Sequence, residues 1–275
     1  MALVALCALT TGAQAQASKI FVSSTGSDGN DGSRQAPKRS FQAAHDAVAA
    51  GGGIVVLDTA GYGTVTITKS VSIVVPPGVS GFITGTGYGV GDPDGIHIAA
   101  SSTDVVSIRG LIVENAPTGA SIASAGTVTF ENCIFRNVSD GITGKGSFKI
   151  IATGDTIENV SFGVDLRAQG GGNLDAIFDG VAITNASAGF VVTNPNTTLS
   201  ASHCSVSNAS TAFAANYGGT ILADECRISN SHYGVAFQFQ LNAAITPVIA
   251  TRGNNTIFNV GTPVKYGQLT PFAAH

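Results

Sequence analysis

An asparagine that recurs at nearly constant spacing constrains the fold of this chain more than any other feature. Successive copies are 22, 22, 26, 23 and 22 residues apart. An aliphatic residue or phenylalanine stands two residues before each copy, and a glycine, once replaced by alanine, stands four residues after it. The copies are Asn115, Asn137, Asn159, Asn185, Asn208 and Asn230. Self-similarity at a short fixed period predicts a solenoid, in which each repeat packs against its neighbours.

Each repeat contains three short segments in which apolar residues alternate with others. In the repeat around Asn137 the apolar positions are Val128 and Phe130, then Cys133 and Phe135, then Ile142. An apolar period of two predicts strands that bury one face, and three strands in 22 residues leave no room for a helix. The pattern predicts a parallel β-helix with three strands per coil, and about eight coils between residues 54 and 260.

Stacking of the coils gives the repeated residues their expected roles. Equivalent residues of neighbouring coils are expected to lie ~4.8 Å apart, the spacing of adjacent strands. The recurring asparagine then occupies a turn, where its side-chain amide can bond the asparagines above and below it and form an asparagine ladder. The glycine four residues later is expected to supply a backbone conformation that other residues adopt only at a cost.

The first 17 residues are predicted to be an export signal. Residues 1–15, MALVALCALTTGAQA, are an apolar run followed by small residues, and A-x-A cleavage sites end at Ala15 and at Ala17. The protein is therefore expected to be secreted or periplasmic. Residues 18–53 are expected to form an N-terminal strand, a turn and a capping helix that starts after Ser40. Residues 54–275 are expected to form the β-helix.

Composition and cysteine placement exclude several classes of protein. Charged residues make up 11% of the chain and the formal net charge is −4, whereas a nucleic-acid-binding protein presents a basic patch or stripe. The apolar run at the N-terminus is shorter than the ~20 residues of a membrane span.

Cys204 and Cys226 fall on one inward position of successive coils and are predicted to be stacked, buried thiols. A disulfide between them is the open alternative, and the oligomeric state is not predicted.

Three stretches resemble secreted bacterial β-helix proteins of the pectate-lyase-like superfamily. They are the opening strand and Gly/Asp/Asn turn at residues 20–37, the helix and first coils at residues 40–73, and the Asn/Gly repeat itself. The resemblance implies an all-β, single-stranded right-handed parallel β-helix with a short N-terminal capping helix. It also implies that catalytic groups, in members that have them, lie on the outer face of the first strand of each coil and on its bordering turns.

The outer face of the first strand carries the candidate catalytic residues. Its central outward positions hold no carboxylate or base: Ser107, Thr129, Ile151, Ile177, Ser200 and Leu222. The candidates at the start of the strand are Lys149 and Asp175, and those at its end are Arg109, Glu131, Asp179, Asp224 and the adjacent His203. Asp179 is two coils, or ~9.6 Å, from Glu131 and from Asp224, at the upper limit of the ~6.5–9.5 Å carboxyl separation of inverting glycosidases. A solvated polar row is the alternative interpretation.

Other candidates lie away from this face. Lys145 and Arg167 are expected to stack on adjacent coils with Asp140 and Asp165 close by, where they could hold an acidic sugar, although a solvated charged face is the favoured interpretation. Tyr217 and Tyr233 could stack on a sugar ring. Residues 26–33, GSDGNDGS, are compatible with calcium, although a Gly/Asn/Asp turn explains them equally well. No other cofactor and no metal site is predicted. Asp155 falls on an inward position, where it is either a buried acid or, as the favoured interpretation, is turned outward by a bulge at Gly154.

Two functions remain open from the sequence. The first is a secreted β-helix protein without a recognisable catalytic motif that binds a glycan or another surface component, or that is structural. The second is a polysaccharide lyase, hydrolase or epimerase acting on acidic polysaccharide in a groove on the first-strand face. The Asn-Thr-Asp, Asp-Asp and Gly-His-Gly motifs of the superfamily's polygalacturonases are absent from the sequence. Whether the protein is an enzyme stays undecided, because fold does not imply function.

Overall fold

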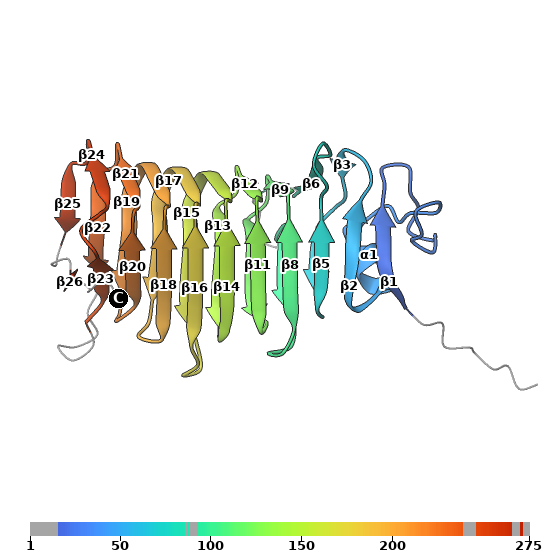
Figure 1. Ribbon diagram of the computed structural model, residues 1–275, viewed down its shortest axis with the longest axis horizontal. Helices are drawn as coiled ribbons and strands as arrows, with labels where there is room; N and C mark the ends of the chain where they lie inside the picture. Colours follow the sequence, from blue (N-terminus) through green and yellow to red (C-terminus); the bar gives the residue numbers. More distant parts are fainter. Residues whose placement is uncertain (1–15, 86, 88–92, 239–245, 266–269, 272–275) are drawn as a thin grey trace, which may run out of the picture.

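The computed structural model describes residues 16–85, 87, 93–238, 246–265 and 270–271, and the chain winds into a rod of stacked coils (Figure 1). An eleven-stranded sheet, here the first-strand sheet, runs along the rod. Its strands are β1 (Ala17–Val22), β2 (Val48–Val56), β5 (Val71–Val74), β8 (Val105–Arg109), β11 (Thr127–Glu131), β14 (Phe148–Thr153), β16 (Leu174–Asp179), β18 (Thr197–Ser202), β20 (Thr220–Asp224), β23 (Val248–Thr251) and β26 (Thr270–Pro271). The eight strands from β5 to β23 agree with the expected number of coils.

The second and third strands of the coils form the rest of the wall. The second strands are β3 (Ala60–Gly61), β6 (Gly81–Thr84), β9 (Leu111–Glu114), β12 (Ile134–Arg136), β21 (Arg227–Ser229) and β24 (Thr256–Phe258). The third strands are β4 (Val65–Ile67), β7 (Ile96–Ala99), β10 (Thr118–Ser124), β13 (Asp140–Gly146), β22 (Tyr233–Gln238) and β25 (Thr262–Lys265). Three long strands span both positions: β15 (Thr156–Ala168), β17 (Ala182–Thr193) and β19 (Ser205–Asn216). Pairing between coils is parallel, so the predicted all-β coil with three strands is confirmed.

The core fills the inside of the coils with the residues that the period of two placed inward. Five phenylalanines of the coils are at most 1% exposed, Phe130, Phe135, Phe178, Phe190 and Phe213, and so is Phe41 of the N-terminal helix. Edge-to-face contacts join Phe130 to Phe135 and Phe178 to Phe190. Burial of whole aromatic rings supplies much of the hydrophobic stabilisation, and because each coil needs its neighbours to complete this burial, the coils are expected to stabilise one another.

The recurring asparagines occupy a left-handed turn between the second and third strands. Their φ angles lie between 50° and 57°, a region that asparagine tolerates better than most residues. The side-chain amides of Asn159, Asn185 and Asn208 each donate to the Oδ1 of the asparagine one coil earlier, at 3.0–3.1 Å. These bonds tie neighbouring coils together at the turn.

The glycine after each asparagine has a different role from the one expected. Gly141 is absent from the residues with positive φ, so its conformation is not the constraint. A Cβ atom there would come within 2.5 Å of the Gly163 carbonyl oxygen and 2.6 Å of Ile157 Cγ2. The small residue is needed because the next coil approaches closely, while the asparagine provides the left-handed backbone.

The N-terminal end of the rod carries the predicted capping helix. Helix α1 (Phe41–Ala47) begins after Ser40, whose hydroxyl accepts a hydrogen bond from the Ala43 amide, as expected for an N-cap. It ends at Val48, where β2 begins directly. No helix in the described part of the chain has the length and apolar character of a membrane span. The predicted export signal, apart from Gln16 and Ala17, lies outside the described residues.

The expected outward bulge at Asp155 is wrong. Gly154 does adopt a left-handed φ of 66°, but this is the ordinary conformation of the turn after the first strand, and Asp155 still points into the core with 1% exposure. Its position is shared by Leu111, Cys133, Val181, Cys204 and Cys226, all at most 1% exposed. The three described cysteines are free, buried thiols.

Candidate functional site

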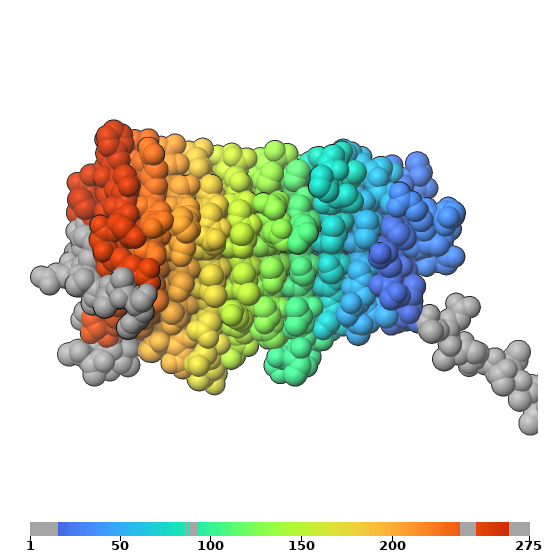
Figure 2. All heavy atoms as spheres, in the orientation of Figure 1, coloured from blue at the N-terminus to red at the C-terminus, as the bar shows by residue number. Residues whose placement is uncertain are grey.

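The outward face of the first-strand sheet has the register that the repeat predicted. Its central row pairs strand by strand along the rod: Ser72, Ser107, Thr129, Ile151, Ile177, Ser200, Leu222 and Ala250. Ile177 is 40% exposed. In the space-filling view the rod has an even surface crossed by the stripes of successive coils (Figure 2). The row is therefore a shallow, extended strip of small polar and aliphatic side chains.

Charged groups gather where the first strands end. Glu131, Asp179 and Asp224 stand on alternate coils of one row, with Thr153 and Ser202 between them, as the spacing predicted. We call this group the edge band; it consists of Arg109, Glu131, Asp179, His203, Asp224, Glu225, Arg252 and Asn254. Lys149 and Asp175 pair in register at the other end of the strands, so the structure does not bring them to the band.

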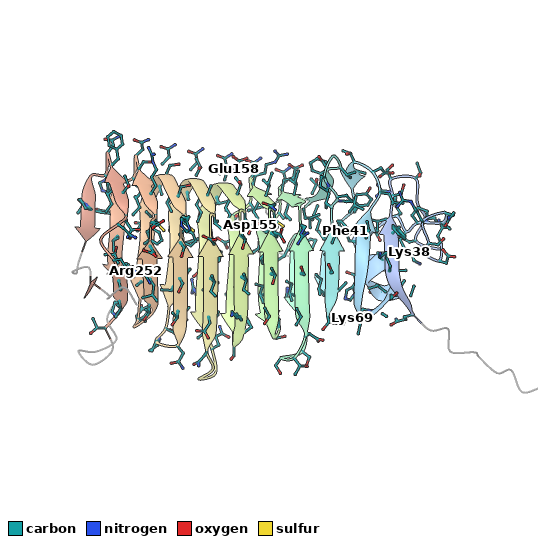
Figure 3. The ribbon with its side chains drawn as sticks, in the orientation of Figure 1. Lys38, Phe41, Lys69, Asp155, Glu158 and Arg252 are labelled. Atoms are coloured by element: carbon teal, nitrogen blue, oxygen red, sulfur yellow. The ribbon has the colours of Figure 1, made fainter. Side chains whose placement is uncertain are left out.

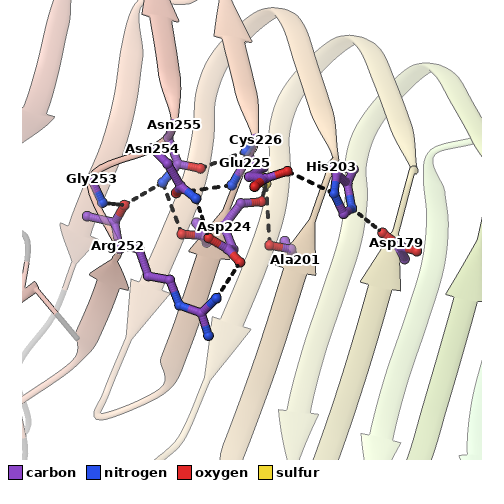
Figure 4. A network of polar contacts seen from close by, with 12 residues as sticks. Asp179, Ala201, His203, Asp224, Glu225, Cys226, Arg252, Gly253, Asn254 and Asn255 are labelled. Carbon is purple, nitrogen blue, oxygen red and sulfur yellow. Dashed lines mark hydrogen bonds and ion pairs between the residues drawn. The ribbon is translucent and has the colours of Figure 1, made fainter. Parts of the chain in front are cut away.

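His203 joins three coils within the edge band (Figure 4). Its Nδ1 lies 2.8 Å from Asp179 Oδ1 and its Nε2 lies 2.9 Å from Glu225 Oε2. The hydrogen bond to Asp179, supported by the charges of both carboxylates, raises the pKa of His203 above its ordinary value. All three side chains are more than half exposed, so the pair of carboxylates and the imidazole present polar atoms to the solvent.

The backbone beneath this cluster is unusual for its residue types. From β8 onward the turn after the first strand is left-handed, and Gly110, Asn132, Gly154 and Gly180 fill it in four successive coils. The next two coils place His203 and Glu225 there, with φ of 52° and 49°. Such residues adopt this region at a cost. His203 and Glu225 therefore occupy a backbone conformation that glycine or asparagine would adopt at lower cost.

Two residues of the edge band were missed from the sequence. Arg252 Nη1 lies 3.1 Å from Asp224 Oδ2, and the Asn254 amide donates to Asp224 Oδ1 at 2.7 Å (Figure 4). Both follow β23, which pairs with β20. The alignment of Val248–Thr251 with the preceding repeat was the signal that could have placed them beside Asp224.

At the N-terminal side of the band, Arg109 and Glu131 form an ion pair at 2.5 Å. Each of the described cations Arg109, His203 and Arg252 thus already faces a carboxylate of the band. The band holds four carboxylates against these three cations, so none of the three is left for an anionic ligand, and its exposed oxygens and N–H groups suit hydroxyl groups.

Two loops at the opposite edge of the first-strand sheet border an open hollow of about 560 Å³. Its lining comes from Ala168–Gly172 and Asn194–Asn196, and the Asn196 amide donates to the Gly171 carbonyl at 3.2 Å. The first of these loops leads into β16 and contains the insertion that lengthens one repeat to 26 residues. The central row is therefore bordered by polar groups on both sides.

The third strands carry a separate charged cluster. Lys145 and Arg167 pair in register, as predicted. The Arg167 guanidinium donates to both oxygens of Asp165, whose side chain is only 10% exposed. Burial, together with the charge of Asp165, raises the pKa of Asp140. This cluster lies on a different sheet from the edge band and contributes nothing to it.

The remaining candidates are scattered. Tyr233 opens β22 and packs against His232 with ring centroids 4.1 Å apart, while Tyr217 follows β19 in a left-handed conformation. In residues 26–33, Asp28 accepts the Arg39 and Ser40 amides, and Asp31 accepts an amide from the same loop. Within the described ranges, no three His, Cys, Asp or Glu residues are arranged to hold a metal ion.

Comparison with known proteins identifies relatives of the fold. The sequence pattern of the family described as right handed beta helix region matches residues 94–259. No curated protein matches the chain. The structure resembles pectate lyase Pel9A with a TM-score of 0.67 and 15% identity, covering 91% of this chain and 78% of that one. It resembles an alginate lyase from Paenibacillus sp. (TM-score 0.52, 11% identity, 83% and 95% covered) and a lacto-N-biosidase from Eubacterium ramulus (0.51, 9%, 92% and 67%).

Proposed function

This chain belongs to the right-handed β-helix family, and from that premise we propose that it binds a polysaccharide along the outward face of the first-strand sheet. The observation that carries the proposal is the central row, a continuous strip that is bordered by the edge band on one side and the loop hollow on the other. The similar solved structures of two lyases and a lacto-N-biosidase support a carbohydrate role for the fold.

The side chains of the strip match the chemistry of a sugar chain. A sugar ring has C–H faces, which pack on apolar side chains such as Ile151, Ile177 and Leu222, and a rim of hydroxyl groups. Carboxylate oxygens and guanidinium or amide N–H groups bond such hydroxyls with a definite geometry. A chain that runs along the rod would meet the same row on each coil, because equivalent residues repeat at the strand spacing.

The pairing of charges favours a neutral polysaccharide. An acidic sugar would need an uncommitted cation, and a lyase or epimerase would need one to neutralise the sugar carboxylate during proton abstraction. In the edge band the guanidinium and imidazole groups already bind Glu131, Asp179, Glu225 and Asp224. Binding is therefore better supported than the lyase, hydrolase or epimerase alternative on acidic polysaccharide.

A matched pair of substitutions tests the proposed face. Ile177→Asp places a charge in the middle of the central row, and Phe162→Asp does the same on the third strands; the two side chains are 40% and 38% exposed. We expect affinity electrophoresis in neutral and acidic polysaccharides to show retardation of the parent protein by a neutral one. Ile177→Asp should abolish the retardation and Phe162→Asp should preserve it. Equal loss in both variants, or retardation by acidic polysaccharides alone, would contradict the proposal.

We also propose that the protein is exported, on the strength of the N-terminal apolar run and the A-x-A sites. The mature N-terminus recovered from the periplasm or the medium should be Gln16 or Ser18. An intact residue 1 in the recovered protein would contradict export by this signal.

A further inference from the structure

Asp155 is a buried acid without a cation. It lies at the turn after β14 (Figure 3), and its side chain points into the core of the rod, since it is 1% exposed. Its Oδ1 accepts the Cys133 amide at 2.6 Å, whereas Oδ2 is the one buried side-chain polar atom of the described residues without a hydrogen-bond partner. A buried carboxylate in such surroundings carries a large desolvation cost.

The C-terminal part of the rod contains a neutral counterpart of Asp155. Thr256 pairs with Arg227 as Thr156 pairs with Ile134, so Asn255 and Asp155 stand at the same position, one residue before a threonine and next to Cys226 and Cys133 of the preceding coil. Asn255 Oδ1 accepts the Cys226 amide at 2.7 Å, the same bond that Asp155 makes. Its Nδ2, which corresponds to Asp155 Oδ2, donates to the Ala223 carbonyl and to the Thr251 hydroxyl. The second polar atom at this position is therefore a donor in the counterpart coil.

We propose that Asp155 is a neutral carboxylic acid in the folded protein, with its proton on Oδ2, and that loss of this proton loosens the coil around it, making the middle of the rod a pH-sensitive element. The groups facing Asp155 support the assignment. Glu131, at the end of β11, is negative and is paired with Arg109 on the outer surface. The other facing group is the Cys133 thiol, whose pKa is raised to about 12 by burial and by the nearby Asp155.

The direction of the pH dependence follows from burial. Desolvation, reinforced by the charge of Glu131, raises the pKa of Asp155 to about 7, whereas in the unfolded chain it is near 3.8. The folded state therefore holds the proton more tightly. The stabilisation is complete below pH about 4, declines as the pH rises to about 7, and is absent above that. Between these limits the unfolding equilibrium constant should rise by about a hundredfold to a thousandfold from this group alone.

Reciprocal substitutions at the two equivalent positions provide the test. Urea unfolding of the full chain would be followed at about pH 5 and about pH 8. Asp155→Asn should remove most of the fall in unfolding midpoint between these values, because an amide cannot ionise. Asn255→Asp should add a further fall, smaller because Asn255 is only half-buried. Asp155→Val serves as a second variant, since Val181 fills the same position one coil later.

A direct probe separates protonation from stability. The infrared band of a protonated carboxylic acid should be present in the parent protein near pH about 6 and absent from Asp155→Asn or Asp155→Val. The inference would be overturned by an absent band in the parent protein, or by a fall in midpoint that is unchanged in whichever Asp155 variant folds.

Discussion

The first and third strands belong to the same coils, yet their outward faces satisfy their charged groups in different ways. On the third strands, Asp165 is nearly buried beneath Arg167, which donates to both of its oxygens. On the first strands, His203 contacts both Asp179 and Glu225 while each of the three side chains remains more than half exposed. The difference indicates that the third-strand charges stabilise the wall of the rod, whereas the first-strand charges are available to a ligand.

The two faces also differ in the residues that occupy their special backbone positions. Glycines at the start of the third strands allow neighbouring coils to approach closely. At the end of the first strands, His203 and Glu225 replace glycine and asparagine at left-handed positions. On the third strands the glycines serve close packing, whereas on the first strands His203 and Glu225 adopt a less favourable backbone conformation in which their polar side chains are exposed.

The largest expected difference between the two faces is the loss of stability caused by a larger side chain. Gly141→Val should destabilise the protein by about 3 kcal/mol or more, because the added atoms meet the backbone of the next coil. Thr129→Val, on the first-strand face of the same coil, should change the free energy of unfolding by less than about 0.5 kcal/mol. Urea unfolding measures both, and a Gly141→Val variant of normal stability would show that the coils can separate at no cost.

Removal of one carboxylate from each face should separate structural from exposed charges. Asp165→Ala leaves Arg167 without its carboxylate beside Lys145 and should cost about 1–2 kcal/mol, allowing for partial exposure of the guanidinium. Asp179→Ala should leave the unfolding midpoint unchanged. A larger loss for Asp179→Ala than for Asp165→Ala would reverse the comparison.

The contribution of each asparagine turn to the free energy of unfolding should depend on the position of that turn along the rod. Asn159 bonds to Asn137 and Asn185, whereas the described bond of Asn259 is to Asn230. Asn159→Gly should therefore cost about 1–2 kcal/mol and Asn259→Gly about half as much, glycine being chosen to keep the left-handed backbone free of strain. Equal losses in thermal or urea unfolding would argue against coupling between the asparagines.

The smallest expected effect is a change in the pKa of His203 on the first-strand face. The hydrogen bond that His203 donates to Asp179 is the main cause of the raised pKa of His203. Asp179→Asn should therefore lower that pKa toward 6.5 further than Glu225→Gln does, as followed by NMR titration of the imidazole ring. Because the folded pKa is raised, any stabilisation by this group is present at low pH and lost as the pH rises through it. A stronger effect of Glu225→Gln would assign the main contact to the other carboxylate.

The repeat was sufficient to predict the sheets and the register of the candidate site. Equivalent positions in successive coils must stack, so Glu131, Asp179 and Asp224 could be aligned without coordinates. Local conformation was harder to predict. Asp155 was expected to point outward because burying a charged carboxylate is costly, yet it points inward, and protonation would reduce that cost. The glycine after each asparagine was expected to supply a left-handed turn, but it allows close packing of neighbouring coils instead. Arg252 and Asn254 lie in a degenerate final repeat, where only the alternating residues Val248–Thr251 could have been aligned with the preceding repeat.

Methyl NMR during titration with the polysaccharide retained in electrophoresis tests the central claim most directly, because it reports on both faces in one sample. Binding along the first-strand sheet predicts that the methyl signals of Ile151, Ile177 and Leu222 shift with ligand concentration while that of Thr143, outward on the third strands, stays in place. Shifts at Thr143 without shifts at the central row would contradict the assignment of the ligand to the first-strand face.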